Sequence, residues 1–375
     1  MSVARAILIS LALALVLALA PAAGAAQRRV PQGFYGVMYD RGIAVAPEAD
    51  QDAQNALMAR SGVESVRVVF SWAAAQPEAG RPPSFTDTDA LVARTTRRGL
   101  RLLPVVMGAP VWARQYPDKP GSPPTNPGDY GAYLQALIGR YGPAGSFWRE
   151  HPELPRRPLR EWQVWNEPHL QGFWEAPGPW EDGYVDLLSA AHDAVKRADP
   201  GARVVLASLA DFSWRHLQKV YDAGGRRLFD VVAMNFYTSK PSDEVRAVRK
   251  VRTVLRRNHQ SRLSVWLTEI TWPAAKGRDK PRARWQRSWY QTDRGMATRL
   301  TQAYDVLVRY RRSLRLGRVY WYTWSSGYRP GDLFDFGGLS SFDGSRSRAR
   351  PALRAYQRSA RRYEGCAKTS LGRCR

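Results

Sequence analysis

The sequence predicts a (β/α)8 barrel, in which eight parallel strands close into a cylinder covered by helices. Three observations predict this TIM-barrel architecture. Eight short β-rich runs alternate along the 375 residues with eight longer amphipathic stretches. Several runs are apolar at consecutive positions, which is typical of parallel strands buried on both faces. No glycine-rich nucleotide loop follows the first run, which disfavours a doubly wound open sheet.

Each predicted element has its own pattern. The strands, in order, are Phe34–Tyr39 (FYGVMY), Ser65–Phe70 (SVRVVF), Leu100–Met107 (LRLLPVVM), Glu161–Trp165 (EWQVW), Arg203–Ala207 (RVVLA), Val231–Phe236 (VVAMNF), Leu263–Leu267 (LSVWL) and Val319–Thr323 (VYWYT). The helices, in order, are Asp50–Arg60, Asp87–Arg98, Gly128–Tyr141, Trp180–Ala198, Ser213–Ala223, Asp243–Asn258, Thr292–Arg315 and Arg350–Arg362. Pro117–Pro127 is proline-rich and is interpreted as a loop that follows the third strand.

The N-terminal segment predicts export, and export bears on the C-terminal tail. Residues 1–26 have the pattern of a secretory signal: Arg5, the apolar run Ala6–Ala20, then small residues with Ala-x-Ala at Ala23–Ala25. We expect cleavage near residues 25–26, with an uncleaved anchor as the alternative, and a secreted or cell-envelope-associated protein. The barrel domain is predicted over residues 27–363. In the tail 364–375, export permits a Cys366–Cys374 disulfide, with two free thiols as the alternative.

Two glutamates follow predicted strands. The fourth strand ends in Trp165-Asn166-Glu167-Pro168, and Thr268-Glu269 follows the seventh. Functional residues of such barrels collect at the C-terminal ends of strands, so both carboxylates are expected at one cleft. A carboxylate pair is the apparatus of glycoside hydrolysis, with one group donating a proton and the other attacking the anomeric carbon. Taken singly, each is also compatible with a salt-bridged rim residue.

These two motifs together resemble clan A of the glycoside hydrolases, which are retaining barrel enzymes. Family 39 is the most similar and family 5 an alternative, and the resemblance covers Phe34 to Tyr363. It implies that Glu167 is the acid/base and Glu269 the nucleophile. It also implies that Asn166 bonds the sugar 2-hydroxyl.

The resemblance implies supporting roles as well. Arg67 on the second strand would keep the nucleophile ionised, with a structural ion pair as the alternative. Tyr237 would bond the nucleophile carboxylate, with a rim aromatic as the alternative. Trp324 would floor the subsite of the cleaved sugar, with Trp321 as the neighbouring choice. The clan often carries a histidine near strand three or six, which is missing here; His169 is interpreted as a polar or simply solvated loop residue.

Fourteen tryptophans suggest surfaces on which sugars stack. The candidates lie just beyond predicted strands or in the loops that follow them, with packing as the equal alternative: Trp72, Trp112, Trp174, Trp180, Trp272 and Trp285. No metal or cofactor is expected, because the five histidines are scattered and no nucleotide-binding motif occurs.

The charge is +24, with 57 Lys and Arg against 33 Asp and Glu. The stretch from Arg246 to Arg318 holds 20 of the basic and four of the acidic residues, and so carries +16 of it. Such charge suggests an anionic partner, but the export signal and the lack of a nucleic-acid motif disfavour nucleic acid. The sequence therefore predicts a secreted, monomeric, retaining glycosidase that acts on a polysaccharide or glycoconjugate, with an acidic glycan or a cell surface as partner. A non-catalytic carbohydrate-binding or wall-associated barrel is the alternative.

Overall fold

The computed structural model describes residues 27–375 except 40, 45, 330, 333 and 343–346. The predicted signal segment 1–26 therefore lies outside the described residues. Within the described residues, no helix is long and apolar enough to cross a membrane.

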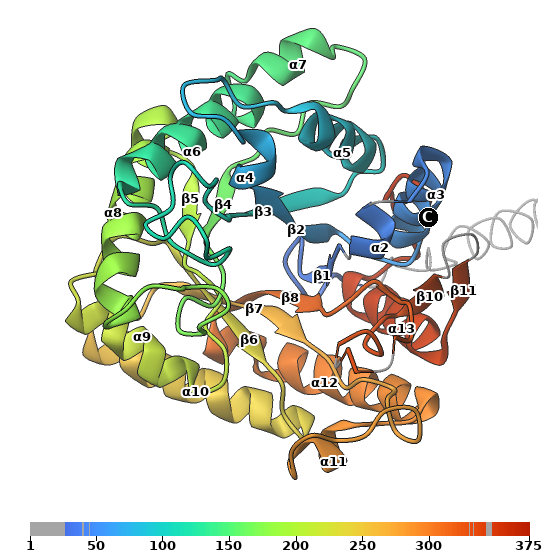
Figure 1. Cartoon of the computed structure of the whole chain (residues 1–375). Helices are drawn as coiled ribbons and strands as arrows, with labels where there is room; N and C mark the ends of the chain where they lie inside the picture. The colour runs from blue at the N-terminus through green and yellow to red at the C-terminus, as the bar shows by residue number, and fades with distance from the viewer. Residues whose placement is uncertain (1–26, 40, 45, 330, 333, 343–346) are drawn as a thin grey trace, which may run out of the picture.

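Eight parallel strands form a closed barrel in chain order, which confirms the predicted fold class (Figure 1). They are β1 (Tyr35–Met38), β2 (Ser65–Ser71), β3 (Arg101–Met107), β4 (Glu161–Val164), β5 (Arg203–Val205), β6 (Val231–Phe236), β7 (Ser264–Ile270) and β8 (Leu316–Trp321). The barrel closes where β8 pairs with β1, with Gly36 opposite Tyr320. A Cβ at Gly36 would lie 2.4 Å from the Tyr320 ring, so glycine makes the room that this ring needs.

Helices surround the barrel. The long ones are α3 (Glu48–Arg60), α5 (Thr86–Arg97), α6 (Pro127–Tyr141), α8 (Trp180–Ala198), α9 (Ser213–Asp222), α10 (Pro241–Arg257), α12 (Asp293–Leu314) and α13 (Pro351–Glu364). The short ones are α2 (Arg41–Ala44), α4 (Trp72–Ala75), α7 (Ser146–Glu150) and α11 (Gln286–Trp289). Beyond β8, the short strands β9 (Ser325–Ser326), β10 (Ser340–Phe342) and β11 (Ser347–Ala349) form a small separate sheet that the sequence pattern does not predict.

Two layers of apolar side chains hold the barrel together. One lies between the strands and the helices, and a smaller cluster fills the barrel interior: Leu103, Val205, Val231, Ala233, Trp266 and Tyr320. Below that cluster, Arg318 lies 4.1 Å from the Trp266 ring centre and 2.6 Å from the Glu161 carboxylate. The interior is therefore packed and is not a pore.

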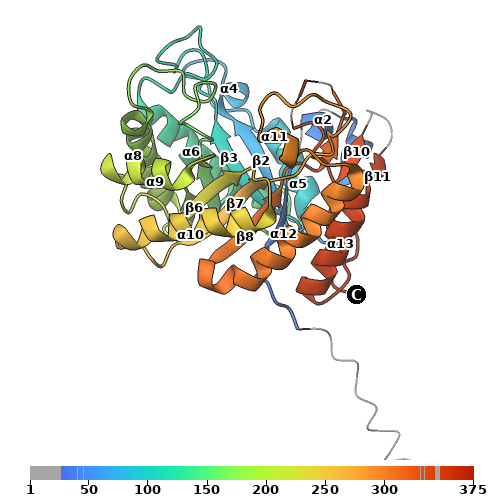
Figure 2. The same cartoon turned by 90° about the horizontal axis from the view of Figure 1, so that it is seen from below.

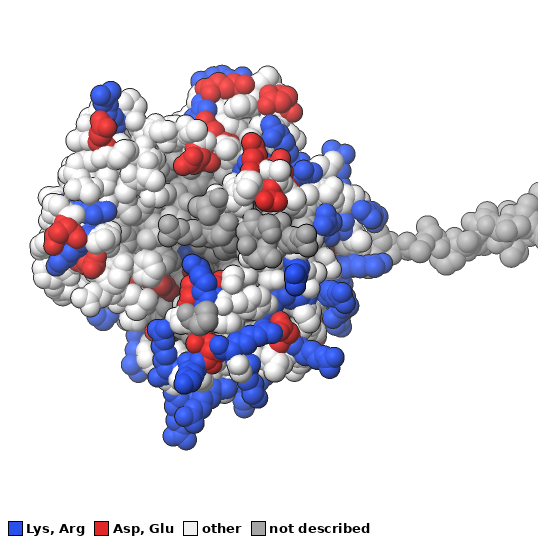
Figure 3. All heavy atoms as spheres, turned by 45° about the vertical axis from the view of Figure 1, so that its right-hand side comes forward, with Lys and Arg blue, Asp and Glu red and all other residues white. Residues whose placement is uncertain are grey.

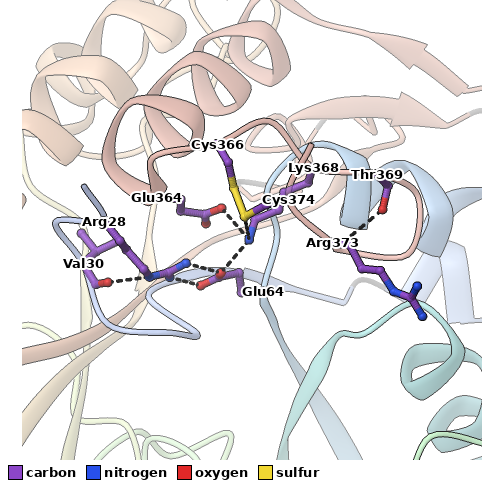
Figure 4. Close-up of a disulfide and its surroundings, with 9 residues drawn as sticks. All are labelled: Arg28, Val30, Glu64, Glu364, Cys366, Lys368, Thr369, Arg373 and Cys374. Atoms are coloured by element: carbon purple, nitrogen blue, oxygen red, sulfur yellow. Dashed lines mark hydrogen bonds and ion pairs between the residues drawn. A yellow bond between two sulfur atoms is a disulfide. The ribbon is translucent and has the colours of Figure 1, made fainter. Parts of the chain in front are cut away.

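The two ends of the barrel differ. Figure 2 shows the N-terminal segment and the end of α13 on one side of the barrel, and the loops with α4 and α11 on the other. On the first side, a disulfide joins Cys366 to Cys374 (Figure 4). Between these cysteines, the Lys368 ammonium lies 3.3 Å from Glu64 and 3.5 Å from Glu364, and Glu64 also pairs with Arg28 at 2.6 Å. This ion-pair cluster attaches the tail and the N-terminal segment to the barrel.

Candidate active site

Glu167 lies just beyond β4, where the backbone leaves the strand. Trp165 and Glu167 both have positive φ, at 69° and 42°, so β4 ends at Val164 and not at Trp165 as predicted. The Glu167 N–H donates to the Ser208 carbonyl at 3.0 Å, and the buried Trp165 indole donates to the Phe173 carbonyl at 2.7 Å. These contacts hold the backbone in a left-handed conformation that residues other than glycine rarely adopt.

Glu269 lies within β7, which continues to Ile270, three residues beyond the predicted end. Met234 pairs with Leu267 but Asn235 pairs with Glu269, so Thr268 is an extra residue in β7. In a regular strand Thr268 and Glu269 would face opposite sides. The bulge allows both side chains to bond with residues of the barrel interior, which is how bulges re-aim side chains near active sites.

Arg67 joins these elements from β2. Its guanidinium donates to the Glu269 carboxylate at 2.6 Å, to Asn166 Oδ1 at 2.7 Å and to Gln163 Oε1 at 2.9 Å. The side chain is only 2% exposed, so this ion pair is shielded from solvent. The Tyr237 hydroxyl donates to the other oxygen of Glu269. Glu269 thus accepts hydrogen bonds from a guanidinium and from a phenol, one on each carboxylate oxygen.

Glu167 has different surroundings. It is 8% exposed, and its Oε1 accepts a hydrogen bond from the Asn235 amide at 2.8 Å. Burial first, and then the negative charge of Glu269, raise the pKa of Glu167 to about 8. At neutral pH this carboxyl is therefore mostly protonated and can donate its proton.

The structure brings Glu167, Glu269, Asn166, Arg67 and Tyr237 into one hydrogen-bonded group. Three further members were not singled out from the sequence: Gln163, Ser208 and Asn235. Ser208 Oγ accepts from the Gln163 amide at 2.6 Å and lies 2.8 Å from the Thr268 hydroxyl. Strand alternation would have placed Gln163 and Asn235 inside the barrel, but Ser208 lies just beyond the short β5 and carries no such signal.

Four of the tryptophans proposed from the sequence are buried. Trp72, Trp272, Trp321 and Trp324 are all 0% exposed. Trp324 donates to Gln54 Oε1 at 2.8 Å, Trp321 donates to the Gly337 carbonyl at 2.7 Å, and Trp72 stacks on Tyr133 with ring centres 5.8 Å apart. No ring of this group presents a face to solvent in the structure, and a contact with substrate stays a prediction.

Other aromatic rings flank the nucleophile. Phe334 lies 4.9 Å from Tyr237 and 5.3 Å from Tyr322, centre to centre, and all three are partly exposed. Burial and the charge of Glu269 raise the pKa of the Tyr322 hydroxyl, so it stays protonated beside the site. The Trp289 ring contacts those of Tyr237 and Trp285, and Trp285 is 46% exposed. The loop tryptophan that faces solvent here is therefore Trp285.

His169 is not a solvated loop residue. Its ring stacks on that of His216 at 4.2 Å, and burial, followed by the charge of His216, lowers its pKa to about 3. In the part of the chain that the structure describes, no three His, Cys, Asp or Glu side chains are grouped so that they could hold a metal ion.

No protein-family model matches the chain, and no curated protein is similar to it in sequence. Solved structures are similar. A family 39 glycoside hydrolase from the gut symbiont Bacteroides cellulosilyticus WH2 superposes with a TM-score of 0.64 and 20% identity, over 90% of this chain and 64% of that one. The family 39 enzyme from Xanthomonas axonopodis pv. citri gives 0.61 and 20%, over 89% and 67%.

The catalytic domain of a family 53 glycoside hydrolase from Ignisphaera aggregans gives a TM-score of 0.59 and 20% identity, over 87% of this chain and 96% of that one. The chain thus spans about two thirds of the family 39 structure from Bacteroides and nearly all of the family 53 domain. At 20% identity, these neighbours show a shared barrel fold. The chain has the fold of the clan A glycoside hydrolases.

Proposed function

We propose that the protein is a secreted retaining glycoside hydrolase that cleaves a polysaccharide or glycoconjugate through Glu167 and Glu269. One observation carries the proposal: two buried glutamates at one barrel end have opposite environments. Glu269 is paired with Arg67 and Tyr237, whereas burial raises the pKa of Glu167 to about 8. Where the surroundings of two carboxyls differ in this way, the one that keeps its proton is assigned as the acid, and the other as the nucleophile.

The proposed reaction has two steps. In the first, the Glu269 carboxylate attacks the anomeric carbon while Glu167 gives its proton to the departing glycosidic oxygen, which leaves a covalent glycosyl ester on Glu269. In the second, Glu167, now ionised, takes a proton from water as the water oxygen attacks the same carbon and Glu269 departs. The configuration is retained because the carbon is inverted twice.

The remaining polar groups serve this exchange. Arg67 bonds both Glu269 and the Oδ1 of Asn166, so the Asn166 amide hydrogens are oriented away from it and are available to a sugar hydroxyl. Asn235 accepts at Oδ1 from Thr268 at 2.9 Å, which directs its own amide to Glu167. The amide hydrogen bond stabilises Glu167 when it becomes the base of the second step.

Substitution with chemical rescue tests the proposal. On a panel of aryl glycosides and polysaccharides, Glu269→Ala and Glu167→Ala should each lose activity by about 10³-fold or more. Azide should restore turnover in both variants, giving a glycosyl azide of inverted configuration with Glu269→Ala and of retained configuration with Glu167→Ala. Glycan binding with no turnover in the unmodified protein would instead favour a carbohydrate-binding barrel.

Export and assembly are proposed on sequence grounds. The signal pattern in residues 1–26 supports export. Intact-mass measurement of protein from the culture medium should give a chain that begins near residue 26 or 27, and light scattering should give the mass of a monomer. A cell-bound chain that retains residue 1 would mean that the segment is an anchor.

A further inference from the structure

A groove of about 430 Å³ lies between α12 and α13, outside the barrel and apart from the residues of the candidate active site. Arg294 and Thr298 line it from the first turns of α12, and Arg354 and Arg358 line it from α13. Its volume is in the range of pockets that hold small ligands or a short length of polymer.

Within the part of the chain that the structure describes, the positive charge in this groove has no acidic partner. The three arginines are exposed, and among the described residues no carboxylate lies within ion-pair distance of any of them. Asp293, the acidic residue beside Arg294, is already bonded to Arg278 at 2.6 Å and to Arg350 at 2.8 Å. Arg354 and Arg358 are four residues apart on one helix, where like charges repel and disfavour the helix. A bound polyanion would remove that repulsion.

The groove lies toward the end of the barrel that carries the catalytic pair. Barrel helices run opposite to the strands, so the first turns of α12 and α13 lie near the C-terminal ends of the strands. The Arg278–Asp293–Arg350 ion pairs connect the loop after β7 to the start of α13. That loop also carries Lys276, Lys280, Arg284 and Arg287. Figure 3 shows Lys and Arg side chains gathered over this part of the surface.

We propose that this groove binds an acidic polysaccharide, a sugar chain that bears carboxylate groups, and holds it beside the cleft while another part of the chain enters the active site. Guanidinium groups match carboxylates with paired N–H donors, so three arginines in one groove would bind successive acidic sugars. The inference rests on the proposed glycosidase function for its sugar partner. Nucleic acid is also negatively charged, but the carboxylate pair of the candidate active site favours a sugar chain as the partner.

The experiment measures binding of polygalacturonate in the Glu269→Gln background, where the polymer is not consumed. The groove variant is Arg294→Gln/Arg354→Gln/Arg358→Gln. The matched control is Arg60→Gln/Arg97→Gln/Arg226→Gln, which removes the same charge from exposed arginines elsewhere on the molecule. Neutral dextran and single-stranded DNA are measured in parallel, each over a range of salt concentrations.

The groove variant should bind polygalacturonate about tenfold or more weakly and with a shallower salt dependence, while the control stays within about twofold. With Glu269 restored, hydrolysis of a small neutral aryl glycoside should be equal in all variants, so loss of groove binding and loss of catalysis are separate results. Equal weakening in both triple variants, or in neither, would overturn the proposal. So would DNA binding as tight as that of polygalacturonate with the same dependence on the three arginines.

Discussion

Glu167 and Glu269 are chemically identical side chains that their neighbours make different. Glu269 accepts one hydrogen bond from a guanidinium and one from a phenol, whereas Glu167 accepts one from an amide and is otherwise desolvated. A carboxyl in such surroundings keeps its proton, because burial penalises the ionised form and the nearby negative charge adds to that penalty. The chemistry of the site therefore depends on Arg67 and Asn235 as much as on the glutamates.

The pH profile should report the proton on Glu167. Because burial and Glu269 raise its pKa to about 8, kcat/KM should fall as pH rises through that value and the acid loses its proton. The Asn235 hydrogen bond lowers this pKa, so Asn235→Ala should move the fall to higher pH. Rate measurements from pH 5 to 10 on both proteins check this. An alkaline limb that stays in place in Asn235→Ala would contradict it.

Removing Arg67 should damage both activity and stability. Arg67→Ala leaves the Glu269 carboxylate buried without its cation, which should destabilise the fold by about 3–5 kcal/mol. Arg67→Lys keeps the charge but loses the fork that bonds Asn166 and Gln163 together. Denaturant unfolding and kcat should rank wild type, lysine and alanine in that order. An alanine variant with unchanged stability would show that the pair carries no structural role.

At the scale of the element, the irregular strand ends position the site. The bulge in β7 and the left-handed residues after β4 interrupt regular pairing where the two glutamates leave the wall. At the opposite end, the disulfide and the Lys368 cluster attach the tail to β2 and α13. The candidate active site thus lies at the C-terminal ends of the strands, and the contacts that hold the tail lie at the opposite end of the barrel.

The disulfide should stabilise the protein without affecting catalysis. Closing a loop over a separation of eight residues removes chain entropy worth about 2.5 kcal/mol. The double variant Cys366→Ser/Cys374→Ser should therefore lose up to about 2–3 kcal/mol in urea unfolding while kcat/KM at 25 °C stays the same. A large loss of activity in still-folded protein would mean that the tail communicates with the catalytic end.

Glu364 should make stability depend on pH. Burial and the charge of Glu64 raise its pKa from the ordinary 4.5 to about 8. The folded protein therefore holds a proton that the unfolded chain releases, so this stabilisation is present below pH 4.5 and lost as pH rises through about 8. Glu364→Gln should show a flatter melting temperature across that range. Identical curves for both proteins would exclude this role.

For the whole molecule, the sequence pattern is sufficient for the barrel and for the core of the site. Short apolar runs and period-3.6 hydrophobicity locate all eight strands and the eight long helices, because burial on both strand faces and on one helix face leaves a local signal. The Asn166-Glu167 and Thr268-Glu269 motifs locate the two glutamates because each motif directly follows a predicted strand.

What the sequence could not supply depends on contacts between distant residues. β8 begins at Leu316, three residues before the predicted start, because its pairing with β7 extends to that residue. A tryptophan that stacks on a sugar and one that packs in the core look the same in a sequence. Only the packing around Trp72, Trp272 and Trp324 shows that they are buried. The partly exposed Phe334 lies in a long loop whose course no local pattern predicts.

The central claim is that Glu269 becomes covalently glycosylated, and trapping that ester tests it most directly. After a glycan panel identifies the sugar, the corresponding 2-deoxy-2-fluoro glycoside should inactivate the protein, and peptide mass spectrometry should place one fluoroglycosyl group on Glu269. The Arg67-paired carboxylate predicts this single adduct. An adduct on a different carboxylate, or turnover with inversion and no adduct, would contradict the account.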